Sequence, residues 1–222
     1  LRGGSVTDAR PLEAQEGSGS STDTDFVLPP GLPTPAQVVA ITGMRKSIAE
    51  HMRSSIADTA QLSFFLEIDV TDTQQMRRKV SKDKDVVITM AHVIIKACVE
   101  TIRDNPEHNS LLVDGNMIQF DGVNIGVAVA LKEGLIVPVL KEADKKNIFQ
   151  IAEDTHQMAL KAREGSLTPD EVSGGTFTVS ILGSVDGFTP ILNASQNAIL
   201  GVGRMLKRPA VKDDQVVIRE MM

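Results

Sequence analysis

The 222-residue sequence contains no tryptophan, no tyrosine and a single cysteine, Cys98. One cysteine excludes an intramolecular disulfide framework and any zinc site that needs several cysteines. It also favours a reducing compartment, with the bacterial cytoplasm as the first choice and the mitochondrial matrix as the second. Because only seven phenylalanines supply aromatic rings, we expect a core built from Val, Ile, Leu, Met and Ala.

The sequence also lacks an excess of basic residues and any long apolar run. The net charge is −6 and the isoelectric point is near 5.3, so a nucleic-acid partner is not expected. No stretch approaches the roughly 18 apolar residues of a membrane-spanning helix, so no membrane partner is expected either. The first residues, beginning at Leu1, are not followed by the apolar stretch of a signal peptide.

Composition divides the chain into two regions. Residues 1–37 are rich in Gly, Ser, Thr, Asp and Pro, which predicts a flexible linker that stiffens through its prolines. Residues 38–222 carry alternating helix and strand patterns, which predict one mixed α/β domain.

The helices of this domain are predicted from apolar spacing and from capping residues. Thr71 and Gln74 read as a capping box, as do Asn147 and Gln150, and Gly165 should end the helix that Asn147 begins. The predicted helices cover residues 44–57, 71–79, 88–102 and 148–164, the third of them buried on most of its circumference, and a short turn follows Thr168.

The strands are predicted from short runs rich in Val, Ile, Leu and Phe. The runs at 123–131 and 135–140 are nearly continuous in apolar residues, as strands covered on both faces tend to be. The predicted strands cover residues 62–70, 117–121, 123–131, 135–140, 176–182 and 198–202, with a final hairpin formed by 210–211 and 216–222.

A search for complete catalytic motifs finds none. The four histidines, His51, His92, His108 and His156, lie in no H-E-x-x-H or H-x3-H context, so no metal site is expected. There is no G-x-G-x-x-G, no phosphate-binding G-x4-G-K-[ST] and no G-x-S-x-G, which leaves nucleotide binding of those types and serine hydrolysis without support.

Several stretches, taken in order, resemble the catalytic domain of the 2-oxo acid dehydrogenase acyltransferases. That domain opens with a helix similar to Gly43-Met44-Arg45-Lys46-Ser47-Ile48-Ala49-Glu50-His51-Met52. The other matching stretches are residues 67–71, 123–140, 174–180, 188–193 and 198–203, so the resemblance covers residues 38–222 with the C-terminal part of the domain missing.

The resemblance implies a chloramphenicol acetyltransferase-like fold, with a mixed sheet flanked by helices. It implies transfer of an acyl group from S-acyl-dihydrolipoamide to coenzyme A, with the lipoyl group carried on an upstream domain. It also implies a homotrimer that assembles into a larger core, and partners in the E1 and E3 components of the complex and the lipoyl domain.

The family mechanism implies roles for two residues. Ser180 matches the hydroxyl donor that stabilises the tetrahedral oxyanion, whereas its alternative role is a strand serine hydrogen-bonded within the sheet. The family's base is a histidine in a D-H-R-x-x-D-G motif, which does not occur in these 222 residues. We therefore expect the chain to be inactive alone.

A second hypothesis is a scaffold or partner-binding subunit that keeps the acyltransferase fold without its chemistry. The D-H-R-x-x-D-G motif in downstream sequence would favour the enzyme, and its loss would favour the scaffold. Acyl specificity, core symmetry and the contacts that bind coenzyme A are not predicted by this sequence.

Overall fold

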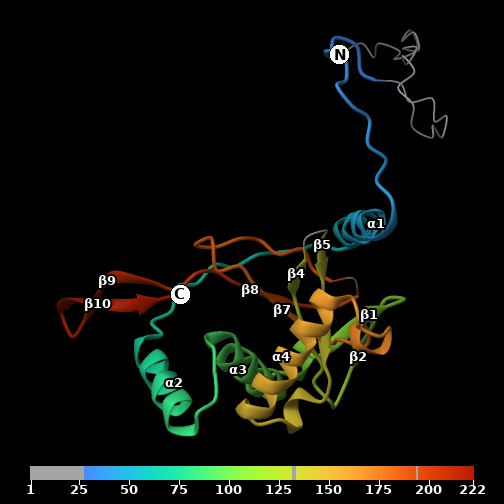
Figure 1. Ribbon diagram of the computed structural model, residues 1–222. Helices are drawn as coiled ribbons and strands as arrows, with labels where there is room; N and C mark the ends of the chain where they lie inside the picture. Colours follow the sequence, from blue (N-terminus) through green and yellow to red (C-terminus); the bar gives the residue numbers. More distant parts are fainter. Residues whose placement is uncertain (1–27, 132–133, 194) are drawn as a thin grey trace. The chain divides into compact units, whose positions relative to one another are not determined.

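A computed structural model describes residues 28–131, 134–193 and 195–222 (Figure 1). It divides the chain into two compact units, Leu1–Ile41 and Thr42–Met222. The described part of the first unit, residues 28–41, contains a turn at Pro30–Gly31 and no helix or strand. Most of the predicted linker 1–37 lies outside the described residues, so the linker stays a prediction.

The second unit contains the helices and strands. Its α-helices are α1 (Gly43–Asp58), α2 (Thr71–Lys84), α3 (Met90–Asp104) and α4 (Ile148–Glu164). Short 3-10 turns are η1 (Pro106–His108), η2 (Ala143–Lys145) and η3 (Asp170–Val172). The strands are β1 (Ser110–Val113), β2 (Asn116–Gln119), β3 (Ile125–Val127), β4 (Val129–Leu131), β5 (Gly134–Ile136), β6 (Val139–Leu140), β7 (Phe177–Ile181), β8 (Ile199–Val202), β9 (Leu206–Lys212) and β10 (Gln215–Met221). No helix in the described ranges is long and apolar enough to cross a membrane.

A four-stranded mixed sheet in the order β6-β3-β7-β8 forms the centre of the unit. Strands β3, β7 and β8 are mutually parallel, and β6 runs antiparallel to β3. Helices α3 and α4 pack on one face of this sheet (Figure 1). Ile95 and Val99 from α3, Ile151 from α4, and Ile125 and Val179 from the sheet are all no more than 1% exposed. The predicted mixed sheet with flanking helices is confirmed.

Local sequence signals explain where α4 begins and ends. The Asn147 side chain accepts hydrogen bonds from the N–H groups of Phe149 and Gln150, and Gln150 accepts one from Asn147 N–H. This reciprocal capping box satisfies N–H groups that the first helical turn leaves without partners. Gly165 ends the helix in the left-handed region with φ +70°, as predicted.

The predicted strand at 62–70 is wrong. This segment is extended, but it pairs only at its end, where an isolated bridge joins Asp69 to Met221 and Ile68 exchanges two backbone hydrogen bonds with Met222. The side chains of Leu62, Phe64 and other residues of the segment are exposed. Their apolar alternation indicates extended backbone, but among the described residues only the end of β10 lies alongside it, next to residues 68–70.

The predicted capping box at Thr71 and Gln74 is also wrong. The residue that caps α2 is Val70, and the Thr71 hydroxyl donates to Asp69 Oδ1 while accepting from Glu220 N–H. Helix α2 also continues to Lys84, beyond the predicted end at residue 79. A threonine near a helix start therefore serves a contact with the distant strand β10 in place of a local cap.

Three further boundaries differ from the predictions. The third helix begins at Met90, with Thr89 as its cap, and its buried residues follow one face only. Each long apolar run, 123–131 and 135–140, divides into two short strands. The second half of the first run (β4) and the first half of the second run (β5) leave the central sheet and pair with each other as a hairpin. Strand β1 was missed, although Asp114–Gly115, both with positive φ, is a two-residue hairpin turn before β2.

The final hairpin is confirmed; its first strand is longer than the predicted 210–211, and its second strand begins and ends one residue earlier than the predicted 216–222. Its strand β10 is attached to the start of α2 by charged contacts. Arg219 Nε lies 2.5 Å from Asp69 Oδ2, and Arg219 Nη2 lies 3.1 Å from Asp72 Oδ1. Hydrogen bonds from Thr71, followed by that from Arg219, lower the pKa of the Asp69 carboxyl to about 2.

We predict that Asp69→Asn will lower the melting temperature near neutral pH and will weaken its decline in acid. A carboxyl whose pKa is lowered on folding stabilises the protein above its ordinary pKa of 3.8, and that stability is lost as the pH falls from 3.8 through about 2. Circular dichroism melts between pH 2 and pH 6 measure the effect. Asp83→Asn, at an exposed position of α2, is the control, and an unchanged acid profile in Asp69→Asn would refute the role of Asp69.

Candidate functional site

Ser180 lies near the carboxyl end of β7, the strand that β3 and β8 flank on either side. It pairs directly with Gly201 of β8, and the register of Val127 with Val179 places Ala128 on its other side. Because side chains alternate along a strand, Phe177 and Val179 face the α3–α4 core. Ser180 therefore faces the opposite side of the sheet and is half-buried there.

The Ser180 hydroxyl is available to a ligand. Its neighbours across the sheet, Ala128 and Gly201, are small, and the structure shows no hydrogen bond from this hydroxyl to any residue that it describes. Thr178, two residues earlier on the same face, differs: its buried hydroxyl donates to Gln196 Oε1 at 2.7 Å. The alternative role for Ser180, a serine bonded within the sheet, lacks its hydrogen bond here.

The position of Ser180 in the sheet is where ligands bind in many α/β proteins. The three parallel strands end at Val127, Ile181 and Val202, so their carboxyl ends share one edge of the sheet. Ligands of open α/β sheets bind in the crevice outside these carboxyl ends.

The chain between β7 and β8 forms a wall on the Ser180 face of the sheet. A Cβ atom placed on Gly201 would lie 2.9 Å from Pro190 Cδ and 3.4 Å from Phe188 Cζ. Paired residues on neighbouring strands project to the same face, so these two rings cover the position directly beside Ser180. The same chain also crosses close to Gly203, where an added Cβ would clash with the carbonyl oxygen of Asp186.

No described hydrogen bond joins any of the four histidines to Ser180 or to another histidine. His51 Nε2 lies 2.9 Å from Asn193 Oδ1, and His92 Nδ1 accepts a hydrogen bond from Thr89 N–H. Burial of the ring, and then the charge of Arg77, lower the pKa of His92. His108 and His156 are exposed.

No described group supplies an obvious nucleophile or metal site. Burial raises the pKa of the Cys98 thiol to about 11, so it is a structural thiol without the thiolate character that reactivity needs. Among the described residues, no three His, Cys, Asp or Glu side chains are grouped so that they could hold a metal ion. None of the histidines donates to or accepts from the Ser180 hydroxyl within the described chain.

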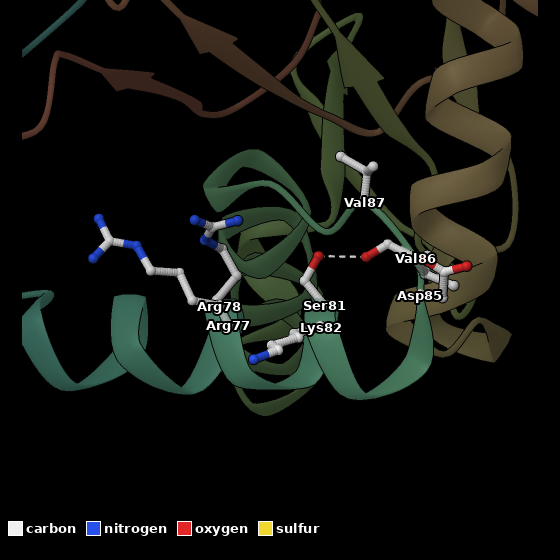
Figure 2. Close-up of a pocket in the computed structure, with 7 residues that line it drawn as sticks. All are labelled: Arg77, Arg78, Ser81, Lys82, Asp85, Val86 and Val87. Atoms are coloured by element: carbon white, nitrogen blue, oxygen red, sulfur yellow. Dashed lines mark hydrogen bonds between the residues drawn. The ribbon is translucent and has the colours of Figure 1, made fainter.

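A surface hollow of about 360 Å³ lies between α2 and the segment that leads to α3 (Figure 2). Arg77 is held there by its own hydrogen bonds, from Nε to Gln74 Oε1 at 2.6 Å and from Nη1 to the carbonyl oxygen of Ile88. Two arginines, one lysine and one carboxylate line the hollow, and Arg78 is also ion-paired with Glu220, so the lining has an excess of positive charge that suits an anionic group. Its lining residues are Arg77, Arg78, Ser81, Lys82, Asp85, Val86 and Val87.

The sequence analysis found Ser180 but missed the hollow and the wall. Arg78 and Lys82 carry a usable signal, because residues four apart lie on neighbouring parts of a helix surface. Phe188 and Pro190 carry none, since their position over Gly201 depends on the fold of the chain between the strands.

Comparison with known proteins finds one family over most of the chain. Residues 33–222 match the model of the 2-oxoacid dehydrogenases acyltransferase (catalytic domain). A dihydrolipoyllysine-residue acetyltransferase component of the pyruvate dehydrogenase complex from Staphylococcus aureus (strain MRSA252) is 34% identical over an alignment of 222 positions, which covers 93% of this chain and 52% of the relative. The chain thus spans about half the length of this relative.

Two solved structures resemble the model closely. One is dihydrolipoamide acetyltransferase from Azotobacter vinelandii, from work on a serine, a histidine and an asparagine in its catalytic mechanism. The other is the cubic core of a pyruvate dehydrogenase multienzyme complex. Each is 31% identical, covers 87% of this chain and 85% of the solved chain, and has a TM-score of 0.79. The predicted acyltransferase fold is therefore confirmed.

We predict that Gly203→Ala will destabilise the protein, because its Cβ would meet the backbone oxygen of Asp186 and force the wall away from the sheet. Overpacking of this kind lowers the free energy of unfolding by about 1–3 kcal/mol. Urea denaturation measures it. Gly183→Ala, where an added Cβ meets nothing within 4 Å, is the matched control, and equal stability of the two variants would contradict the close approach at Gly203.

Proposed function

Because the chain belongs to the 2-oxoacid dehydrogenase acyltransferase family, we propose that it takes part in transferring an acyl group from S-acyl-dihydrolipoamide to coenzyme A. The observation that carries this proposal is the free hydroxyl of Ser180 at the carboxyl end of β7. It lies half-buried between the small residues Ala128 and Gly201 and has no hydrogen bond to the described residues.

The proposed reaction is a thioester exchange. A base removes the proton from the coenzyme A thiol, and the thiolate attacks the carbonyl carbon of the acyl-dihydrolipoamide. The C=O π electrons move to oxygen, and Ser180 donates a hydrogen bond to that oxyanion. Collapse of the intermediate breaks the bond to the dihydrolipoamide sulfur, which takes up a proton, and leaves acyl-coenzyme A. A donor placed where charge develops lowers the barrier by about 3–4 kcal/mol.

The base is the part of this mechanism that the described residues do not supply. His51 and His92 have partners of their own, and the D-H-R-x-x-D-G motif does not occur in the 222 residues. We infer that the chain alone is inactive and that the base is supplied by residues outside this sequence. The work on a serine, a histidine and an asparagine in the Azotobacter vinelandii relative supports a mechanism that needs a histidine besides the serine.

The cationic hollow on α2 is proposed as the site for the phosphate groups of coenzyme A. Arg77 is oriented by Gln74 and Ile88, so part of its ordering cost is met before a ligand arrives. Lys82 and Arg78 also line the hollow, with Arg78 paired to Glu220 at 3.2 Å, and phosphate groups form strong charge-assisted hydrogen bonds with guanidinium and ammonium groups (Figure 2).

Assembly is proposed on the same premise. A homotrimer built into a larger core, with E1, E3 and lipoyl-domain partners, is supported by the likeness to the cubic core of a pyruvate dehydrogenase complex. Exposed apolar side chains in the segment after α1, Leu62, Phe64, Phe65 and Leu66, are between 66% and 89% exposed and offer an interface. A reducing compartment, first the bacterial cytoplasm, is proposed from the single cysteine.

We predict that Ser180→Ala will lower kcat for coenzyme A acylation by about 10²- to 10³-fold with little change in KM, because the hydrogen bond forms in the transition state. The assay compares the chain with the chain extended through the coding sequence that follows it, and Ser180→Ala is measured in the extended form. Ser184→Ala, an exposed serine in the following loop, is the control.

Each result of this assay has a definite meaning. Activity only in the extended form, lost in Ser180→Ala and kept in Ser184→Ala, supports the acyltransferase and the external base. Activity in the short chain would refute the external base. Silence in both forms would favour the scaffold subunit, and full activity of Ser180→Ala would remove Ser180 from the mechanism.

We predict that Lys82→Gln will weaken coenzyme A binding by about two- to fivefold, since an exposed ion pair contributes up to about 1 kcal/mol. Calorimetric titration with coenzyme A measures this change, and titration with pantetheine, which lacks the phosphates, should show none. Lys79→Gln removes the same charge from α2 outside the hollow and serves as control. Equal weakening by both variants would count against the hollow.

A further inference from the structure

The wall beside Ser180 is held by an unusual set of contacts at Leu192. This residue lies between β7 and β8 and belongs to no strand. The Ser55 hydroxyl of α1 donates to the Leu192 carbonyl oxygen at 2.5 Å, and Leu192 N–H donates to Gln61 Oε1 at 3.3 Å. Side chains from one segment therefore satisfy both backbone groups of Leu192, as a neighbouring strand would.

These contacts close into a ring. Gln61 Nε2 donates to Thr59 Oγ1 at 2.8 Å, and the Thr59 hydroxyl donates to the Ser55 carbonyl oxygen at 2.5 Å. Ser55 is 2% exposed, so the ring has one end inside the protein. Because Ser55, Thr59, Gln61 and Leu192 each contact the next, the loss of one member loosens the others.

A second contact lies one turn earlier on the same helix. His51 Nε2 lies 2.9 Å from Asn193 Oδ1. His51 and Ser55 are spaced by four residues, which places them on one face of α1, and Thr59 is the residue that follows the end of the helix. The helix and its exit therefore hold two consecutive residues of the wall, Leu192 and Asn193. The hydrogen bonds of His51, Ser55 and Gln61 to these two residues are called the grip.

The gripped residues lead directly to the position beside Ser180. Pro190, two residues before Leu192, covers Gly201, and Gly201 pairs with Ser180. Closer to β8, Gln196 accepts a hydrogen bond from Thr178 and donates to the Gly175 carbonyl oxygen. The half of the wall next to β8 is thus attached twice, to α1 at Leu192 and Asn193 and to the sheet at Gln196.

We propose that α1 and its exit act as a positioning element for the acyl donor, with His51, Ser55 and Gln61 as positioning residues that hold the wall beside Ser180. This inference rests on the proposed acyltransferase function. The ring aligns the wall over the sheet, and the wall orients the thioester so that its carbonyl oxygen meets the Ser180 hydroxyl. Binding of the acyl donor then depends on a helix that does not touch it.

The test removes the exposed members of the grip and leaves the buried Ser55 in place. The variant is His51→Ala with Gln61→Ala, and Gln61→Glu alone is the conservative variant, because its carboxylate still accepts from Leu192 N–H. Arg53→Ala with Gln75→Ala is the matched control, since both positions are exposed and neither lies in the grip.

Two measurements are made on each protein. Amide hydrogen exchange at Leu192, followed by NMR, reports the grip itself, and the loss of a single hydrogen bond should speed it by about two- to tenfold. Steady-state kinetics of the extended chain report its consequence: KM for acyl-dihydrolipoamide should rise about three- to tenfold while kcat and KM for coenzyme A stay within about twofold. Gln61→Glu keeps the acceptor for Leu192 N–H but loses the donor to Thr59, so it should fall between the parent and the double variant, and the control should behave as the parent protein does.

Unchanged exchange at Leu192 would overturn the ring, whatever the kinetics. Faster exchange with unchanged KM would overturn the positioning role, and a fall in kcat alone would show that the grip only supports folding. If the parent protein transfers no acyl group, the proposed function fails and this inference with it. That failure is recognised because the parent, not the variant, is silent.

Discussion

The parallel pairing of β7 between β3 and β8 is the constraint on which the rest of the site depends. It places Ser180 beside Gly201 and Ala128, and it directs Phe177 and Val179 into the core under α3 and α4. A shift of one residue would bury Ser180 among apolar side chains and expose Val179. The fully buried Val179 and Ile125 make that shift costly, so packing on one face of the sheet sets the chemistry on the other.

Contacts between distant segments hold the parts around this sheet. Arg219 attaches the last strand to the start of α2, and Ser55, Thr59 and Gln61 attach α1 to Leu192. Arg219 pairs with two carboxylates, and Ser55 and Gln61 form hydrogen bonds with the backbone C=O and N–H groups of Leu192, which belongs to no strand. The loop beside Ser180 is therefore ordered by α1 at Leu192 and Asn193 and by the sheet at Gln196.

The proposed chemistry is distributed in the same way. Ser180 supplies oxyanion stabilisation from the central sheet, Arg77 and its neighbours offer charge for phosphate groups, and α1 orients the wall. The base comes from residues outside this sequence in the mechanism proposed here. An acyltransferase of this kind uses the rigid strand for the most demanding geometry and the helices for binding and orientation.

Local signals were enough for the features that depend on neighbouring residues. The Asn147 cap, the Gly165 stop and the final hairpin follow from short-range chemistry, and the ordered family motifs led to Ser180 and the acyltransferase fold. Local signals gave wrong predictions for residues 62–70 and for Thr71. Residues 62–70 have no partner strand along most of their length, and the Thr71 hydroxyl accepts a hydrogen bond from Glu220 N–H in place of capping α2.

The sequence by itself determined the composition of the core, the mixed α/β class and the candidate serine. Only the tertiary structure decided that the Ser180 hydroxyl is free, that Pro190 covers Gly201 and that α1 grips Leu192. The physical reason is the separation along the sequence. Capping and periodicity act within a few residues, whereas the contacts of Ser55 and Gln61 with Leu192 join residues more than 130 positions apart. Such contacts form only when folding brings distant segments together.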